Sequence, residues 1–383
     1  MSDRSPARAR ARDLGIQIGR LAPGRWNAIT DVAGVRVGHT TLISGAGPLV
    51  VGHGPVRTGV TVVLPRASNV AHDPVFAGYH ILNGNGEMTG IAWIEELGVI
   101  NTPIAITNTH SVGVVRDALI AYDVQHGDGV YESTWSLPVV AETYDGYLSD
   151  INGLHVKPEH VFTALDSAAS GPVAEGCVGG GTGMICHSFK GGIGTSSRVL
   201  EANDGGWTVG ALVQANYGGR ALLRVDGVPV GREIPVSEVP APGVPGAENA
   251  GSIIVVLATD APLLPSQCRR LAQRATIGLA RMGGIGANSS GDIFVAFATG
   301  NTGLYDPGDA AEPITLRMLR NDAMTPLFEA AADVTEEAIL NALCMATTTT
   351  GIDGRVAHAI PLDRLREVLH NYRRIDAYSF QNA

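Results

Sequence analysis

The segment that most constrains the fold is the uninterrupted apolar run Ile253–Leu257, which follows the turn-forming sequence Ala241–Gly246. Pro and Gly ahead of a run of Val and Ile predict a loop that leads into a buried strand. Ser252 is therefore expected at the start of a central strand, directly after Gly251, a residue that tolerates positive φ. A serine in that place suits an N→O acyl shift, in which its hydroxyl attacks the preceding carbonyl. The same pattern also fits an ordinary serine that begins a strand.

Other segments predict an α/β protein around this strand. Trp207–Asn216 is expected to be a strand, and Ala221–Val225 another. Ser266–Met282 repeats apolar residues at three- and four-residue steps and predicts an amphipathic helix. Strand blocks that are each followed by helices predict helices packed outside a pair of sheets. Near the C-terminus, Thr325 and Thr335 are each expected to cap the start of a separate helix.

Composition excludes several classes of protein. The 383 residues carry a net charge of −10, which argues against a nucleic-acid-binding surface. No run approaches the roughly 18 apolar residues of a membrane span, so no membrane partner is expected. The four cysteines lack CxxC spacing, and we expect reduced thiols in a cytoplasmic protein. Residues 1–14 form an arginine-containing leader without an apolar core; we expect a disordered arm there, not a secretory signal, and a single catalytic domain over residues 15–383.

Three kinds of hydrolytic site can be compared with the sequence. A serine hydrolase with a nucleophile elbow needs Gly-x-Ser-x-Gly at a strand-to-helix turn, and we find none. A zinc hydrolase needs clustered ligands such as His-Glu-x-x-His, but the histidines are scattered, so no metal is expected. The glycine-rich segment Gly176–Gly194 matches neither a phosphate loop nor a dinucleotide fingerprint, and no organic cofactor is expected. The third kind is an N-terminal nucleophile, whose own α-amine serves as the base. Cleavage between Gly251 and Ser252 would supply it.

Several motifs together resemble one family. AGSIIVVLATDAPL, GIGANSSGDIFVAFATGN and VQANYGG, with DVAGVRVGHTT, LPVVAETYDG and GGIGTSSR, are similar to the DmpA-type aminopeptidases, which include L-aminopeptidase/D-amidase/D-esterases and β-aminopeptidases. The resemblance runs from Gly15 to Tyr372 in the family's order. It implies a four-layer αββα sandwich, layered like the N-terminal-nucleophile hydrolases but with different connectivity. It also implies self-cleavage into residues 1–251 and 252–383, and a homo-oligomer, such as a tetramer, of cleaved protomers.

The resemblance assigns the chemistry to three residues first. Ser252 would be the residue of self-cleavage, the nucleophile and the holder of the basic α-amine. Asn216 matches the position of an oxyanion donor, although a residue there could simply cap its strand. Tyr144 matches an active-site position at which some relatives carry another aromatic residue; core packing is the alternative.

Five further positions follow from the same resemblance. Asn288, Ser290 and Asp292 match a polar network beside the nucleophile, and Asp292 stands where β-aminopeptidases carry the longer Glu. The alternative for Asp292 is a turn residue that bonds its own backbone. Glu132 and Trp135 match a pocket wall in which an acid holds the substrate's ammonium.

The sequence thus predicts an aminopeptidase that removes a small N-terminal residue from peptides, amides or esters with a free amine. L- or D-Ala, Gly and β-amino acids are all candidates for that residue. Two alternatives remain open. One is a self-cleaving acyltransferase of the ornithine acetyltransferase kind, although those proteins cut before threonine. The other is an uncut protein that binds a small molecule.

Overall fold

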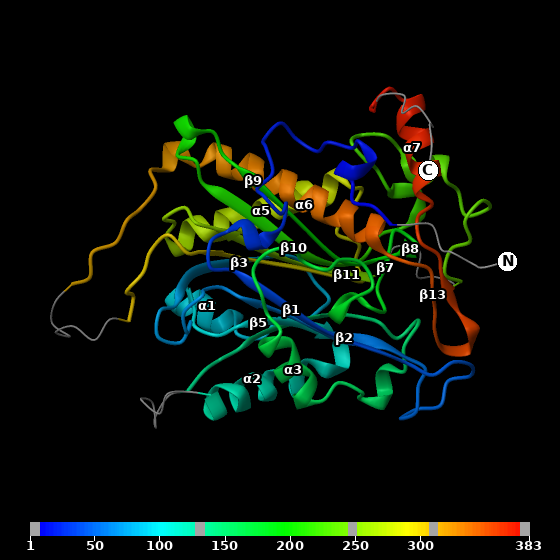
Figure 1. Ribbon diagram of the computed structural model, residues 1–383, viewed down its shortest axis with the longest axis horizontal. Coiled ribbons are helices and arrows are strands. Elements are labelled where there is room, and N and C mark those ends of the chain that lie inside the picture. Colours follow the sequence, from blue (N-terminus) through cyan, green and yellow to red (C-terminus); the bar gives the residue numbers. More distant parts are fainter. Residues whose placement is uncertain (1–7, 127–134, 244–250, 306–312, 376–383) are drawn as a thin grey trace.

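Two β-sheets lie face to face and helices cover both outer faces (Figure 1). This is a computed structural model, which describes residues 8–126, 135–243, 251–305 and 313–375. Helices α5 and α6 lie over one sheet, and α2 and α3 lie over the other (Figure 1). The αββα sandwich expected from the sequence is confirmed.

The larger sheet has six strands in the order β4-β3-β12-β11-β10-β9. The predicted central strand is β11, which pairs antiparallel with β10 and parallel with β12. Their bounds are β4 (Val99–Ile100), β3 (Val75–Gly84), β12 (Ser290–Ala298), β11 (Gly251–Thr259), β10 (Thr208–Asn216) and β9 (Gly192–Val199). Ser252 therefore enters the sheet with a paired strand on each side.

The smaller sheet has four strands in the order β1-β2-β5-β6. Their bounds are β1 (Arg36–Ser44), β2 (Val56–Leu64), β5 (Ile104–Asn108) and β6 (Val139–Thr143). Two short hairpins complete the described strands: β7 (Ile185–Cys186) with β8 (Phe189–Lys190), and β13 (Thr349–Thr350) with β14 (Val356–Ala357). The β7–β8 hairpin reaches the end of β10, which brings it to the edge of the candidate site.

The described helices are α1 (Ile91–Leu97), α2 (Val112–His126), α3 (Pro158–Asp166), α4 (Val230–Glu233), α5 (Pro265–Arg281), α6 (Thr325–Met345) and α7 (Leu362–Asn371). Helix α5 matches its predicted range to within one residue at each end. Helix α6 corrects a prediction, because it continues through Thr335 without a break. The Thr335 hydroxyl donates to the Ala331 carbonyl at 2.8 Å inside the helix and does not cap a new one. The strand expected at Ala221–Val225 is also wrong, since Arg220–Leu222 forms a short 3₁₀ helix.

Three apolar layers fill the spaces between these elements. Side chains alternate along β11, so that Ile253, Val255 and Leu257 pack toward α5 and α6 while Ile254 and Val256 pack toward the smaller sheet. A third layer joins the smaller sheet to α2 and α3. Ser252 is two residues before Ile254, so the same alternation places its side chain on the face toward the smaller sheet.

The N-terminal leader differs from its expected disorder where the structure describes it. Ala11 is fully buried, and Arg12 forms an ion pair with Glu337 at 3.0 Å. The Arg8 guanidinium donates to the carbonyls of Leu343 and Cys344 at 3.2 and 2.6 Å. These carbonyls belong to the last turn of α6, where no intrahelical donor remains for them. Residues 8–14 are therefore packed against α6, where Arg8 satisfies carbonyls at the helix end and Arg12 pairs with Glu337 within the helix.

Candidate active site

Ser252 lies at the start of β11, opposite Asn216 of β10 and Gly291 of β12. Its hydroxyl donates to the carbonyl oxygen of Gly251 at 2.8 Å and accepts the Gly291 N–H at 3.2 Å. The residue is 5% exposed. The hydroxyl is thus held against the carbonyl of the peptide bond that precedes it, and a backbone donor steadies its oxygen.

Gly251 adopts a backbone conformation that only glycine reaches readily. Its φ is +148°, and a Cβ at this position would lie 2.0 Å from the backbone oxygen of Asn216. The glycine therefore allows β10 to approach the Gly251–Ser252 bond closely. This is the positive φ that the sequence suggested for this position.

The Asn216 side-chain amide is held at both ends. Its Oδ1 accepts the Ile185 N–H at 2.8 Å, and its Nδ2 donates to the Tyr144 carbonyl at 3.0 Å. Asn216 is two residues after Gln214 on β10, so both side chains lie on the same face of the strand. The Gln214 side chain bonds groups of the smaller sheet, so Asn216 faces that sheet, as Ser252 does. An amide Nδ2 carries two hydrogens, and the Tyr144 carbonyl uses one of them, so the other is available to a developing oxyanion.

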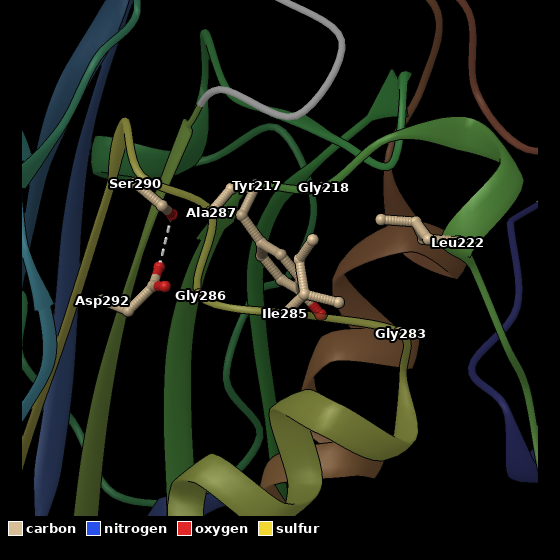
Figure 2. Close-up of a pocket in the computed structure, with 9 residues that line it drawn as sticks. All are labelled: Tyr217, Gly218, Leu222, Gly283, Ile285, Gly286, Ala287, Ser290 and Asp292. Carbon is tan, nitrogen blue, oxygen red and sulfur yellow. Dashed lines mark hydrogen bonds between the residues drawn. The ribbon is translucent and has the colours of Figure 1, made fainter.

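Ser290 and Asp292 form a pair on β12. The Ser290 hydroxyl donates to Asp292 Oδ1 at 2.6 Å, and Figure 2 shows the two side chains turned toward each other. Burial raises the pKa of Asp292, while the hydrogen bonds from Ser290 and from the Ile253 amide lower it. The pair flanks Gly291 and faces the helix-covered side of the sheet. It thus holds the backbone after Ser252 and does not itself touch the Ser252 hydroxyl.

A small cavity lies beside this pair (Figure 2). Its volume is about 10 Å³, enough for about one water molecule, and Tyr217, Ile285 and Ala287 also line it. The Tyr217 hydroxyl is buried and has no hydrogen-bond partner within the described ranges. Asn288, the third member of the predicted network, lies in the exposed turn before Ser290, and none of the described hydrogen bonds joins its side chain to the pair.

The remaining predicted residues are not all brought to this point. Tyr144 contributes its backbone carbonyl, while its side chain is 52% exposed and covers Gly146. The Trp135 ring packs edge-on against the Trp93 ring, with 4.9 Å between the ring centroids. Trp135 precedes the start of β6, whereas Tyr144 follows the end of that strand, so the two residues belong to opposite ends of β6. Glu132 lies outside the described residues.

Glu142 is a carboxylate beside the site that the sequence analysis did not select. It is buried on β6, where its Oε1 accepts the Glu87 N–H at 3.0 Å and its Oε2 accepts the Thr109 hydroxyl. Burial raises its pKa. Gly86 lies between the Glu142 carboxylate and Gly291, the residue whose N–H bonds the Ser252 hydroxyl. A Cβ added to Gly86 would lie 3.2 Å from Glu142 Oε1 and 3.1 Å from the Cα of Gly291. The position of Glu142 in the motif LPVVAETYDG, two residues before Tyr144, was the available signal.

The described parts of the chain contain neither a cluster of metal ligands nor a membrane-spanning helix. Among these residues no group of three or more His, Cys, Asp or Glu side chains could hold a metal ion. None of the described helices is long and apolar enough to cross a membrane.

Comparison with known proteins places this geometry in a family. The model of peptidase family S58 matches residues 27–357. The β-peptidyl aminopeptidase BapA of Sphingosinicella microcystinivorans is 53% identical over 377 residues, which cover 96% of this chain and 93% of that protein.

Two solved structures are also similar over nearly their whole length. A β-aminopeptidase from Burkholderia sp. is 55% identical with a TM-score of 0.87, covering 95% of this chain and 99% of that one. The L-aminopeptidase D-Ala-esterase/amidase of Ochrobactrum anthropi is 46% identical with a TM-score of 0.87, and the match covers 96% of this chain and 99% of that one. The latter is described as a serine aminopeptidase with a variant of the Ntn hydrolase fold.

Proposed function

The chain belongs to peptidase family S58 and is an aminopeptidase, and on this basis we propose that it activates itself by cleaving its own Gly251–Ser252 bond. We propose further that the mature enzyme uses Ser252 to remove a small N-terminal residue, including β-amino acids, from peptides, amides and esters. The observation that carries the proposal is the contact of the Ser252 hydroxyl with the Gly251 carbonyl oxygen at 2.8 Å.

Self-cleavage begins from this contact. The carbonyl carbon lies only ~1.2 Å from its oxygen, so the serine Oγ is already close to the atom it must attack. Attack forms a tetrahedral oxyanion; the Gly251–Ser252 C–N bond then breaks, and the nitrogen takes up a proton. The product is an ester between Gly251 and the Ser252 oxygen. Water hydrolyses it to a Gly251 carboxylate, a free Ser252 hydroxyl and a free Ser252 α-amine.

Turnover repeats the same chemistry on a substrate. The Ser252 α-amine, with a reference pKa of ~7.7–8.0, accepts the hydroxyl proton as Oγ attacks the substrate carbonyl, and it then protonates the leaving amine. The free Nδ2 hydrogen of Asn216 stabilises the tetrahedral oxyanion. Water enters for deacylation, and the α-amine again acts as base. Ser290 and Asp292 hold the Ile253 backbone and offer acceptors beside the new amine.

The substrate's ammonium needs an anionic partner, and Glu142 meets this requirement. Its carboxylate is buried and already fixed by two donors, so a bound ammonium would compensate its charge without reorganisation. Glu132 stays a prediction from the resemblance, as do the pocket role of Trp135 and a direct role for the Tyr144 hydroxyl. Acyl transfer of the ornithine acetyltransferase kind is disfavoured, because this chain has serine at the proposed cleavage point.

Assembly into a homo-oligomer of cleaved protomers in the cytoplasm also belongs to the proposal. The β1–β2 hairpin exposes four apolar side chains near its tip, Ile43, Leu49, Val50 and Val51, and we propose that a second copy covers them. Light scattering of the purified protein would measure the number of protomers.

Amine recognition tests the proposed function. We expect β-Ala-p-nitroanilide and L-Ala-p-nitroanilide to be hydrolysed and their N-acetyl derivatives to be resistant. Glu142→Gln should lower kcat/KM for the free amines by roughly 30-fold, which corresponds to ~2 kcal/mol for a buried charge pair. Glu87→Gln is the matched control, because this exposed neighbour bonds Glu142 only through its backbone. Equal hydrolysis of acetylated and free substrates would contradict the role of Glu142.

A further inference from the structure

Lys190 is a fully buried lysine, and no carboxylate in the described parts of the chain forms an ion pair with it. The chain contains 25 arginines but only two lysines, and the other, Lys157, is exposed. Lys190 Nζ donates to the backbone carbonyls of Met184, Gly191 and Gly181 at 2.7, 2.9 and 3.3 Å. Burial of a charge is costly unless hydrogen bonds compensate it, and here all three ammonium hydrogens have a carbonyl partner.

The Met184 carbonyl connects this ammonium to the candidate oxyanion donor. The Met184 oxygen and the Ile185 N–H belong to one peptide group. That N–H donates to Asn216 Oδ1 at 2.8 Å. A continuous chain of hydrogen bonds therefore runs from Lys190 through one peptide group to the side chain of Asn216, the residue that pairs with Ser252 across β10 and β11.

We propose that Lys190 is a positioning residue of the oxyanion site, which acts through the Met184–Ile185 peptide and the Asn216 amide to fix and polarise the oxyanion donor. The inference rests on the proposed function of Asn216. A cation on the peptide oxygen makes its N–H a stronger donor, and a stronger donor on Asn216 Oδ1 makes the Nδ2 hydrogens more positive. Such chains strengthen each hydrogen bond by about 10–30%. The positive charge is in place before the oxyanion forms and needs no rearrangement.

The surrounding hairpin keeps the relay rigid. Ile185 and Lys190 are the first and last residues of the β7–β8 hairpin. Its two turn residues, His187 and Ser188, have positive φ angles of 49° and 59°. The Arg220 guanidinium donates to their carbonyls at 3.3 and 2.8 Å and stacks on the Phe189 ring. Arginine cannot replace lysine in the relay, because its planar fork cannot direct three donors from one atom.

Cys177 is a titratable group that faces Lys190. Burial raises the pKa of the Cys177 thiol, while the nearby Lys190 and the hydrogen bonds from Thr347 and Thr349 lower it, and the net direction is downward. Burial lowers the pKa of Lys190, so the three carbonyl acceptors are the groups that favour its charged form. The Cys177 sulfur also accepts the Thr347 N–H at 3.3 Å, which holds it near Lys190.

A double-mutant cycle on the purified two-chain enzyme tests the relay. Lys190→Met should lower kcat by about tenfold with little change in KM, and in the Asn216→Ala background it should lower kcat by less than twofold. Lys157→Met is the matched control and should have no effect. An equal loss in both backgrounds would overturn the relay, because Lys190 would then act independently of Asn216. Wild-type turnover by Asn216→Ala alone would instead refute the proposed oxyanion donor, and the relay with it.

A second measurement uses the wild-type enzyme and so does not depend on the folding of a variant. Labelling with [15N]lysine gives two side-chain signals, which the Lys157→Met spectrum assigns. We expect the Lys190 signal to be that of an ammonium at the pH of maximal kcat. It should also shift when an aminoalkyl boronic acid forms a tetrahedral adduct on Ser252, while the Lys157 signal stays fixed. An uncharged Lys190 amine at that pH, or a Lys190 signal that ignores the adduct, would overturn the proposal.

Discussion

Asn216→Ala separates the proposed oxyanion donor from a residue that merely ends a strand. Removal of one preorganised oxyanion donor costs ~2.7–4 kcal/mol of barrier, so mature Asn216→Ala should lose roughly 10²–10³ in kcat with a smaller change in KM. The substitution also removes the acceptor of the Ile185 N–H. A buried donor without a partner costs ~1–3 kcal/mol of folding stability, and we expect the lower end because Asn216 is 6% exposed and water can enter.

Asn216→Asp distinguishes these two effects. The carboxylate still accepts the Ile185 N–H, so the loss of stability should be smaller than for alanine. It has no hydrogen to donate, so kcat should fall at least as far as in Asn216→Ala. Asn371→Ala, at the exposed end of α7, serves as the control.

The assay is hydrolysis of β-Ala-p-nitroanilide by the purified two-chain form, with urea denaturation of the same samples. The two-chain form is required because self-cleavage also passes through an oxyanion and the variants could mature slowly. Wild-type kcat in mature Asn216→Ala would show that Asn216 only caps β10. The oxyanion donor would then have to be sought elsewhere.

Two further predictions concern the cleavage point and a buried carboxyl group. Gly251→Ala should leave one uncut chain on a denaturing gel, because its Cβ would lie 2.0 Å from the Asn216 oxygen; Gly113→Ala, whose Cβ meets nothing within 4 Å, is the control, and normal cleavage of Gly251→Ala would contradict the packing argument. Burial raises the pKa of Asp145 to about 7, above the value of the unfolded chain. The buried carboxylate therefore lowers the free energy of unfolding once it is ionised; this loss is absent at low pH, grows as the pH rises from ~4 toward 7, and is complete above pH 7. Asp145→Asn should therefore stabilise the protein at pH 8 by up to about 4 kcal/mol and have little effect near pH 4; equal urea midpoints for both proteins at pH 8 would refute the shift.

The sequence was most informative where the local pattern decides the structure. The β-branched run after Ser252 did become a central strand, and Gly251 did adopt a positive φ, because both follow from properties of neighbouring residues. The strand blocks that are each followed by helices predicted helices outside a pair of sheets, and the family resemblance added the αββα order of the layers. Asn216 and Ser252 were each expected at a strand end, and their pairing across β10 and β11 is a finding of the structure.

The parts that could not be predicted depend on distant backbone groups. Arg8 bonds carbonyls at the end of α6, more than 330 residues away, and nothing in its own segment indicates them. Thr335 has the sequence signature of a helix cap, but packing keeps α6 continuous and the hydroxyl bonds within it. Lys190 donates to backbone carbonyl oxygens, which every residue carries, so its connection to Asn216 is visible only in three dimensions.

The central claim is that the chain cuts itself at Gly251–Ser252 with Ser252 as nucleophile. Mass spectrometry of the denatured protein, with N-terminal sequencing of the smaller fragment, tests it most directly. For the wild-type protein we expect two chains of 251 and 132 residues, the second beginning Ser-Ile-Ile-Val. For Ser252→Ala we expect a single uncut chain of 383 residues. A wild-type protein that remains uncut, or a Ser252→Ala variant cut at the same bond, would contradict it.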